Sequence, residues 1–225
     1  MSTNEIAIVP SLPAPSFSTL LELTRSVEGV VSTFQIDLVD GRFVPHRSWP
    51  FTEPRADVEW QRIAELPATL RYEYDCMVMQ PEQYVSALAA FNPLRIIIHY
   101  GSTEAWAELQ AHAAAHQYDL GVAITNDVDP AALESLITHG VTFVQVMGIA
   151  QVGAQGQPFD ERTPKTIRAL RACYPDITIA VDGSVNEQTA PRLVSAGATQ
   201  LAPGSAVAKA ADPEAAVAAL RAATA

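Results

Sequence analysis

Three aspartates and one histidine stand at the ends of separate short apolar runs in this chain. They are Asp37, Asp75, His99 and Asp182. A carboxylate inside an apolar run costs free energy unless it is hydrogen-bonded, ion-paired or bound to a metal. Carboxylates and an imidazole that face one opening can transfer protons or hold a divalent cation. Together, at the ends of successive runs, the four residues indicate a catalytic or metal site.

Each of these residues also has a purely structural interpretation. Any one of them could cap a helix or be a hydrogen-bonded polar group of the core. Asp40 stands beside Gly41, where an aspartate commonly caps a turn. For Asp37 we favour a functional role, because it is embedded in the apolar run. For His99, a structural hydrogen bond at the strand end and an assisting role in catalysis both stay open.

Loops rich in glycine and serine predict an anion-binding site. One such pair follows the apolar run that ends at Asp182, a second pair follows the last run, and residues 148–157 form a longer small-residue loop. Glycine lets backbone N–H groups approach an anion closely, and serine adds a hydroxyl donor. The candidate phosphate-binding residues in these loops are Gly153, Gly156, Gly183, Ser184, Gly204 and Ser205.

Eight apolar runs alternate with amphipathic, alanine-rich segments. We predict strands at residues 5–10, 33–37, 69–75, 95–99, 119–124, 142–147, 177–182 and 199–203. We predict helices at residues 16–28, 53–66, 82–91, 102–116, 130–139, 164–173, 187–196 and 213–223. Eight strand–helix pairs favour one (β/α)₈ TIM barrel of the ribulose-phosphate-binding type, a single domain over residues 1–225. An open doubly wound sheet is less favoured, because no G-x-G-x-x-G motif follows the first strand.

Helix boundaries are marked by residues with known end preferences. Asp129, Thr163 and Asp212 each precede a proline and predict helix N-caps. Gly140 and Gly197 stand where a left-handed residue commonly ends a helix. These signals support the alternation of strands and helices.

The composition excludes several classes of protein. The 225 residues are 48% hydrophobic and 17% charged, with a formal net charge of −11. Without a run of Lys or Arg, such a chain should repel nucleic acid and anionic membranes. Cys76 and Cys173 form no metal or disulfide pattern, which suits reduced thiols in the cytoplasm. We find no signal peptide and no membrane span, and therefore expect a cytoplasmic protein.

The scarcity of lysine argues against two reaction classes. Only Lys165 and Lys209 occur, and neither lies on a predicted strand. A Schiff-base aldolase needs a lysine on a strand, so this class is disfavoured. The D-x-K-x-x-D decarboxylase barrels are disfavoured too, because residues 37–40 read DLVD.

Several motifs occur in the order known from one family. Residues 9–12 (VPSL) are similar to its A-P-S-I/L start, and residues 36–45 (IDLVDGRFVP) to its V-D-V-M-D-G-x-F-V-P. Residues 76–84 (CMVMQPEQY) are similar to L-M-V-x-x-P-x-x-Y, and residues 181–186 (VDGSVN) to V-D-G-G-V-N. Residues 156–159 (GQPF) and 204–206 (GSA) match two further loops. Over nearly its whole length the chain thus resembles the ribulose-phosphate 3-epimerase family.

The resemblance implies roles for individual residues. In that family two aspartates act as opposed acid and base at C3 of a ketopentose phosphate, and a divalent metal, often zinc, stabilises the enediolate. The matching residues are Asp37 and Asp182. Ser11, in the motif at residues 9–12, joins the candidate substrate-binding residues.

The departures from the family concern the metal. Its two ligand histidines are replaced by Gln35 and Asp75. Gln35, Asp37, Asp75 and Asp182 would make an all-oxygen set, which favours Mg²⁺ or Mn²⁺ over Zn²⁺, or the site holds no metal. Val39 stands for a methionine, and residues 151–153 (QVG) stand for Asn-Pro-Gly.

Two functions are compatible with the sequence. The first is an isomerase that epimerises a ketose phosphate by two-aspartate proton transfer through an enediolate. The second is a non-catalytic or repurposed sugar-phosphate-binding barrel that has lost its metal. We expect a phosphorylated sugar as ligand and a homo-oligomer. Residues 43–51, with Trp49 and Pro50, look exposed and would cover the site or meet another subunit.

Overall fold

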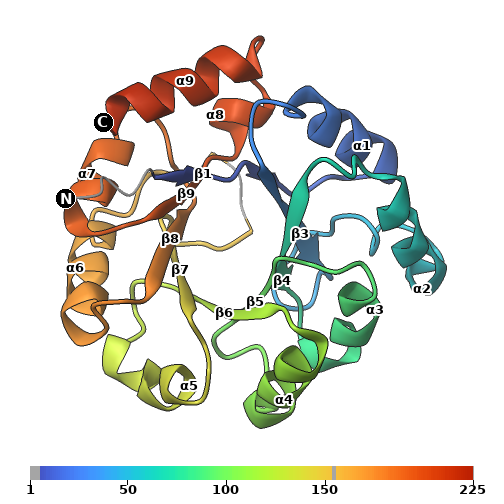
Figure 1. The fold of residues 1–225 in the computed structure, drawn as a ribbon, viewed down its shortest axis with the longest axis horizontal. Helices are drawn as coiled ribbons and strands as arrows, with labels where there is room; N and C mark the ends of the chain where they lie inside the picture. Colours follow the sequence, from blue (N-terminus) through green and yellow to red (C-terminus); the bar gives the residue numbers. More distant parts are fainter. Residues whose placement is uncertain (1–5, 154–155, 225) are drawn as a thin grey trace.

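The computed structural model describes residues 6–153 and 156–224. Residue 5 of the expected first strand, and Ala154 and Gln155 of the small-residue loop, lie outside the described residues. The described chain forms a ring of parallel strands surrounded by helices (Figure 1). The predicted barrel is therefore confirmed.

The wall of the ring is one parallel sheet with the strand order β1-β9-β8-β7-β6-β5-β4-β3-β2. The strands are β1 (Ala7–Ile8), β2 (Ser11–Leu12), β3 (Thr33–Val39), β4 (Arg71–Met77), β5 (Arg95–His99), β6 (Asp119–Ile124), β7 (Phe143–Met147), β8 (Thr178–Asp182) and β9 (Gln200–Ala202). Every neighbouring pair that this order joins is parallel. All their carboxyl ends therefore meet at one opening of the ring, where such barrels place their sites.

The first strand of the barrel is split into β1 and β2, and the two halves close the ring. β1 pairs with β9, whereas β2 pairs with β3. Pro10 lies between them and has no backbone N–H, so it interrupts the ladder. Its carbonyl still accepts from the Gln35 N–H at 2.9 Å, and the Val9 N–H donates to the Leu201 carbonyl at 2.9 Å.

Helices surround the sheet in chain order (Figure 1). They are α1 (Phe17–Ser26), α2 (Ala56–Glu59), α3 (Val85–Ala89), α4 (Trp106–His116), α5 (Glu134–Thr138), α6 (Thr163–Cys173), α7 (Ala190–Ala196), α8 (Ser205–Ala208) and α9 (Pro213–Ala223), with the 3₁₀ helices η1 (Trp60–Glu65), η2 (Pro81–Gln83) and η3 (Pro130–Leu133). Three predicted helices thus consist of a short α-helix joined to a 3₁₀ turn, and α8 was not predicted.

Three of the five predicted helix ends are confirmed. Gly140 is left-handed, but it follows His139, which is the C-cap of α5. Asp129 and Asp212 accept hydrogen bonds from backbone N–H groups of the first turn, and Gly197 is the left-handed C-cap of α7. Thr163 was expected to cap α6, but it is the first residue of that helix and Arg162 precedes it. Instead of capping, the Thr163 hydroxyl accepts from the Asn126 side chain at 3.0 Å.

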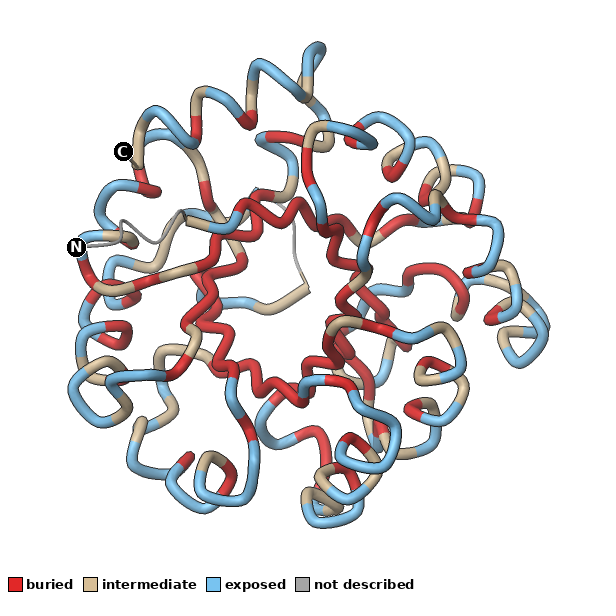
Figure 2. Tube along the Cα trace, viewed as in Figure 1, coloured by how far each residue is buried: buried red, intermediate tan, exposed pale blue. Residues whose placement is uncertain are grey.

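Buried residues form the wall of the ring, and exposed residues lie on the outer side of the helices (Figure 2). The main apolar core lies between sheet and helices. Inside the barrel, Ile97, Ala123, Phe143 and Ala180 form a small apolar cluster. Each strand of a barrel alternates inward and outward side chains, so this cluster forms one layer of the interior.

The segment at residues 43–51 is more buried than expected. Trp49 is only 1% exposed and contacts the rings of Phe17 and Trp60. Its indole N–H donates to Glu59 at 3.1 Å. The expectation of an exposed Trp49 is therefore wrong, because this side chain fills the space between α1 and η1.

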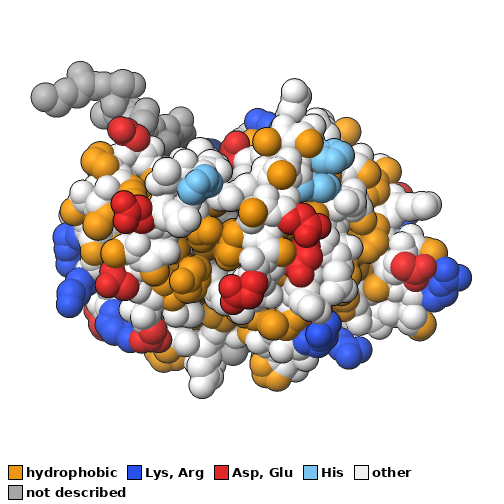
Figure 3. Space-filling view, turned by 90° about the horizontal axis from the view of Figure 1, so that it is seen from below, with side chains coloured by type: hydrophobic (Ala, Val, Ile, Leu, Met, Phe, Trp, Pro, Cys, Tyr) orange, Lys and Arg blue, Asp and Glu red, His pale blue; other side chains and the backbone are white. Residues whose placement is uncertain are grey.

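The surface is mixed in charge on the face seen in Figure 3, where acidic, basic and apolar side chains are interspersed. Among the described residues the large hydrophobic side chains that are exposed are Val58 and Tyr100. In the described part of the chain, no helix has both the length and the apolar character needed to cross a bilayer.

Candidate active site

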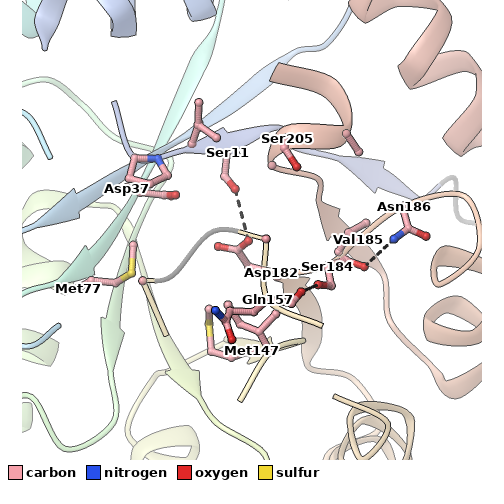
Figure 4. A pocket seen from close by; sticks show the side chains of 18 residues that line it. Ser11, Asp37, Met77, Met147, Gln157, Asp182, Ser184, Val185, Asn186 and Ser205 are labelled. Carbon is pink, nitrogen blue, oxygen red and sulfur yellow. Dashed lines mark hydrogen bonds between the residues drawn. The ribbon is translucent and has the colours of Figure 1, made fainter. Parts of the chain in front are cut away.

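A cavity of about 290 Å³ opens at the carboxyl ends of the strands. In Figure 4, Asp37 and Asp182 point into it from β3 and β8, with Met77 and Met147 beside them. The candidate catalytic and phosphate-binding residues that line it are Ser11, Asp37, Gly153, Gly156, Asp182, Gly183, Ser184, Gly204 and Ser205. The structure thus brings both groups together around one cavity.

Asp37 and Asp182 are joined by the side chain of Gln35. The Gln35 amide nitrogen donates to Asp37 Oδ1 at 3.0 Å and to Asp182 Oδ2 at 3.1 Å. The Ser11 hydroxyl donates to Asp182 Oδ1 at 3.4 Å. The two carboxyl groups are therefore held side by side at the floor of the cavity.

Asp75 lies deeper than the other two aspartates and does not line the cavity. It is directly opposite Asp37 in the register of β3 and β4, and it has no exposed surface. Asp75 Oδ1 is 3.0 Å from His99 Nε2, and Asp75 Oδ2 accepts from the Gln145 amide at 3.1 Å. His99 is 2% exposed. Its hydrogen bond to Asp75 connects it to the cluster of aspartates.

The electrostatic surroundings favour protonation of the two aspartates that line the cavity. Burial raises the pKa of Asp37 well above its ordinary value, and the charges of Asp182 and Asp75 raise it further. Burial, followed by the charge of Asp75, raises the pKa of Asp182 to about 7. The Gln35 hydrogen bonds act in the opposite direction on both groups. A carboxyl group with such a pKa can accept and donate protons near neutral pH.

The three aspartates also fit a divalent cation. One carboxylate oxygen from each of Asp37, Asp75 and Asp182 lies within 4.8 Å of the others. The side-chain oxygen of Gln35 is buried and has no hydrogen-bond partner among the described residues. Such a set contains oxygen donors only, which is the chemistry that Mg²⁺ and Mn²⁺ prefer.

The loops after β7 and β8 are tightly packed on each other beside the cavity. The Gly148 N–H donates to the Asp182 carbonyl at 2.6 Å, and the Ser184 hydroxyl donates to the Gln157 carbonyl at 2.6 Å. A Cβ on Gly148 would lie 2.1 Å from the Gly183 carbonyl oxygen. Gly183 itself has a φ of +101°, and Ser184 is also left-handed at +54°. The Ser184 side chain thus holds the loop, which leaves its backbone N–H as the group available for an anion.

Apolar side chains cover another side of the site. Val39, Val44 and Met77 form a buried cluster against which Phe43 and Val152 pack. A Cβ on Gly153 would lie 2.6 Å from Val44, so the loop after β7 closely approaches the loop after β3. These contacts hold the loops after β3 and β7 together beside the cavity.

Asp40 has the structural role that its neighbour Gly41 indicated. Asp40 Oδ1 accepts from the N–H groups of Arg42 and Phe43 at 2.7 and 3.0 Å, and Oδ2 accepts from Met79 at 3.0 Å. It is 5% exposed. Asp40 therefore stabilises the loop after β3 and does not belong to the cluster of aspartates.

Gln145 is a site residue that the sequence reasoning missed. It stands in the middle of the apolar strand β7, and its side chain is fully buried against Asp75. A polar residue embedded in an apolar run was the signal that singled out Asp37, and it would have found Gln145 as well.

Known proteins resemble the chain over most of its length. The ribulose-phosphate 3-epimerase of Schizosaccharomyces pombe is 27% identical over 215 residues, which cover 95% of this chain and 92% of that protein. The cytoplasmic isoform of ribulose-phosphate 3-epimerase from Oryza sativa subsp. japonica is 30% identical over 220 residues, covering 95% and 92%. The ribulose-phosphate 3-epimerase of Mycobacterium tuberculosis H37Rv is 26% identical over 226 residues, covering 98% and 93%.

Solved structures support the same fold. A 3-hexulose-6-phosphate synthase superposes with a TM-score of 0.71 at 20% identity, covering 98% of this chain and 100% of that one. KGPDC from Streptococcus mutans superposes with a TM-score of 0.74 at 11% identity, covering 96% of each chain. At these identities the likeness concerns the barrel alone.

A family model provides the assignment. The model described as the ribulose-phosphate 3 epimerase family matches residues 7–208, which include every candidate site residue named above. The aspartates on β3 and β8, the loops around the cavity and this match are consistent with one another. The chain belongs to the ribulose-phosphate 3-epimerase family.

Proposed function

We propose that the protein epimerises a ketose phosphate at the carbon next to the carbonyl group, through an enediolate. The observation that carries this proposal is the pair Asp37 and Asp182, two buried carboxyl groups that face one cavity with raised pKa values. The names of the relatives support ribulose 5-phosphate as the first substrate to test.

The two aspartates supply the proton transfers. In each turnover one carboxylate removes the proton from C3, and the other, protonated, carboxyl group delivers a proton to the opposite face of that carbon. The protonation states of the pair are exchanged at the end, so the reverse reaction can follow. In the metal-free protein a pKa of about 7 for Asp182 suits this alternation, because both forms are then populated near neutral pH.

Gln35 and Ser11 orient the pair. Gln35 donates to one oxygen of each aspartate, which holds their relative position during proton transfer. Ser11 donates to the other oxygen of Asp182. We assign the substrate phosphate to the side of the cavity formed by the loops after β8 and β9, where backbone N–H groups around Gly183, Ser184, Gly204 and Ser205 can bind an anion without a cationic side chain.

Asp37, Asp75 and Asp182 would hold a divalent cation of the Mg²⁺ or Mn²⁺ type. Gln35 would add its side-chain oxygen only after its amide turned over, because its nitrogen faces Asp37 and Asp182. When bound, such a cation would stabilise negative charge on the substrate oxygens.

A homo-oligomer and a cytoplasmic location stay predictions, which sedimentation and fractionation would check.

The proposal is tested by hydrogen exchange at C3. The protein, stripped with EDTA and resupplied with Mg²⁺, Mn²⁺ or Zn²⁺, is incubated with ribulose 5-phosphate in D₂O and followed by NMR. We expect deuterium at C3 together with formation of the 3-epimer. Asp37→Asn and Asp182→Asn should each reduce turnover by about 10²–10⁴-fold, since each removes one proton-transfer group. Inorganic phosphate should still bind to both variants.

Asp176→Asn is the matched control, because Asp176 is an exposed aspartate away from the cavity lining. It should exchange the substrate proton at the rate of the unaltered protein. Absence of exchange with every pentulose and hexulose phosphate, with or without metal, would refute the epimerase. If phosphate binding persisted under those conditions, the protein would be a sugar-phosphate binder.

A further inference from the structure

Asp75 has both carboxylate oxygens held by side chains from other strands. His99 on β5 contacts Oδ1 at 3.0 Å, and the Gln145 amide on β7 donates to Oδ2 at 3.1 Å. The three side chains are at most 2% exposed, so no bulk water competes for these hydrogen bonds. Two donors on the two oxygens of a planar group prevent its rotation.

The orientation set in this way directs Asp75 toward the other two aspartates. One of its oxygens remains within 4.8 Å of oxygens of Asp37 and Asp182. Each carboxylate oxygen has two lone pairs, so a hydrogen bond from His99 or Gln145 leaves one lone pair for a cation. The donors therefore support ligation and do not compete with it.

His99 is itself held in place from the opposite side. Its ring packs against the Phe43 ring, with the centroids 5.0 Å apart and the planes inclined by 51°. Phe43 belongs to the loop after β3 and packs on the apolar cluster beside the cavity. The imidazole is thus confined between this loop and Asp75, which restricts Nε2 to a single direction.

We propose that His99 and Gln145 are positioning residues that orient the Asp75 carboxylate toward a divalent cation shared with Asp37 and Asp182. This inference rests on the cation site of the proposed function. It assigns His99 the role of donating its Nε2–H to Asp75 Oδ1. Hydrogen-bond partners behind metal ligands typically change metal affinity by about 10–100-fold when they are removed.

The test measures Mn²⁺ binding directly, by electron paramagnetic resonance of free Mn²⁺ in solutions of the metal-stripped protein. His99→Leu and Gln145→Leu remove the donors, and each should weaken Mn²⁺ binding by about 10–100-fold. His99→Gln retains an N–H donor and should restore the affinity to within about threefold of the unaltered protein. Inorganic phosphate affinity should be the same in all variants, because the anion-binding loops are untouched.

His116→Gln serves as the control, because His116 is an exposed histidine on α4 outside the cavity lining. Its Mn²⁺ affinity should equal that of the unaltered protein. The inference would be overturned by equal or tighter Mn²⁺ binding in His99→Leu, by failure of His99→Gln to restore binding, or by absence of Mn²⁺ binding in the unaltered protein. Absence of C3 exchange, with the Mn²⁺ pattern intact, would refute the epimerase alone.

Discussion

The carboxyl group of Asp182 combines burial with a neighbouring negative charge, and its stability contribution depends on pH. Its pKa of about 7 in the folded protein lies above the value of about 4 that an unfolded aspartate has. The folded state therefore binds this proton more tightly. Its contribution to stability is complete below about pH 4 and is lost as the pH rises through about 7.

We therefore expect Asp182→Asn to stabilise the metal-free protein at high pH although it reduces turnover. At about pH 8 the free energy of unfolding should rise by up to a few kcal/mol, because no buried carboxylate has to be ionised. At about pH 4 the variant and the unaltered protein should differ little. Urea unfolding in EDTA at both pH values measures this difference. Asp176→Asn should show no such pH-dependent gain, and a destabilised Asp182→Asn at high pH would contradict the expectation.

At the same scale, the sequence identified residues of the candidate site but not the hydrogen bonds that join them. Asp37, Asp75 and Asp182 stood out because each carboxylate interrupts an apolar run, and the structure brings them together. Neither the link from Gln35 to two aspartates nor the Gln145 contact with Asp75 follows from the sequence. Those contacts cross the barrel interior between residues as much as 147 positions apart in the chain.

Gly148 and Gly183 show how two loops depend on each other. A Cβ on Gly148 would meet the backbone oxygen of Gly183 at 2.1 Å, which no side-chain rotation relieves. Gly148→Ala should therefore separate the loops after β7 and β8. We expect a loss of about 1–3 kcal/mol in stability from overpacking, together with weaker binding of inorganic phosphate. Thermal unfolding and phosphate titration calorimetry measure the two effects.

Gly29→Ala is the control for a glycine replacement without a clash. Gly29 has a φ of +80° and no atom within 4 Å of the added Cβ. Gly29→Ala should lower the free energy of unfolding by the backbone strain alone, about 1–2 kcal/mol, and leave phosphate binding unchanged. Equal phosphate affinity in Gly148→Ala and the unaltered protein would show that anion binding does not depend on the position of the loop after β8.

Strands and helices were predicted accurately where the pattern of apolar residues was clear. The strands at residues 95–99 and 119–124 agree with β5 and β6 at both ends, since continuous apolar runs identify buried parallel strands. Residues 53–66 and 130–139 differ, because each forms a short α-helix joined to a 3₁₀ helix. Periodicity does not separate these two helix types over a few residues, and packing on the barrel decides between them.

At the scale of the whole molecule, the barrel interior carries a second polar group near the amino ends of the strands. Arg95 pairs with buried Glu73, and Gln200 donates to the other Glu73 oxygen at 2.9 Å. The Arg95 guanidinium also lies over the Phe143 ring at 3.8 Å. Burial raises the pKa of Glu73, whereas the Arg95 charge lowers it.

Arg95→Met should strongly destabilise the protein, because it leaves a buried carboxylate without its cation. We expect a loss of about 3–5 kcal/mol in the free energy of unfolding, measured with urea near neutral pH. Arg55→Met breaks an exposed pair with Asp57 and should leave the free energy of unfolding nearly unchanged. A loss in Arg95→Met as small as that of Arg55→Met would show that Glu73 is stable without its partner.

The apolar cluster of Ile97, Ala123, Phe143 and Ala180 has a consequence for how this barrel can evolve. On β5, β7 and β8 these residues stand two positions before His99, Gln145 and Asp182, and so they separate the upper ligand-binding layer from the Arg95 layer below. Because this apolar layer separates them, residues of the upper layer can be substituted without contact with the Arg95 layer. Positions 35 and 75 could then accept different side chains, while the lower layer continued to hold the barrel together.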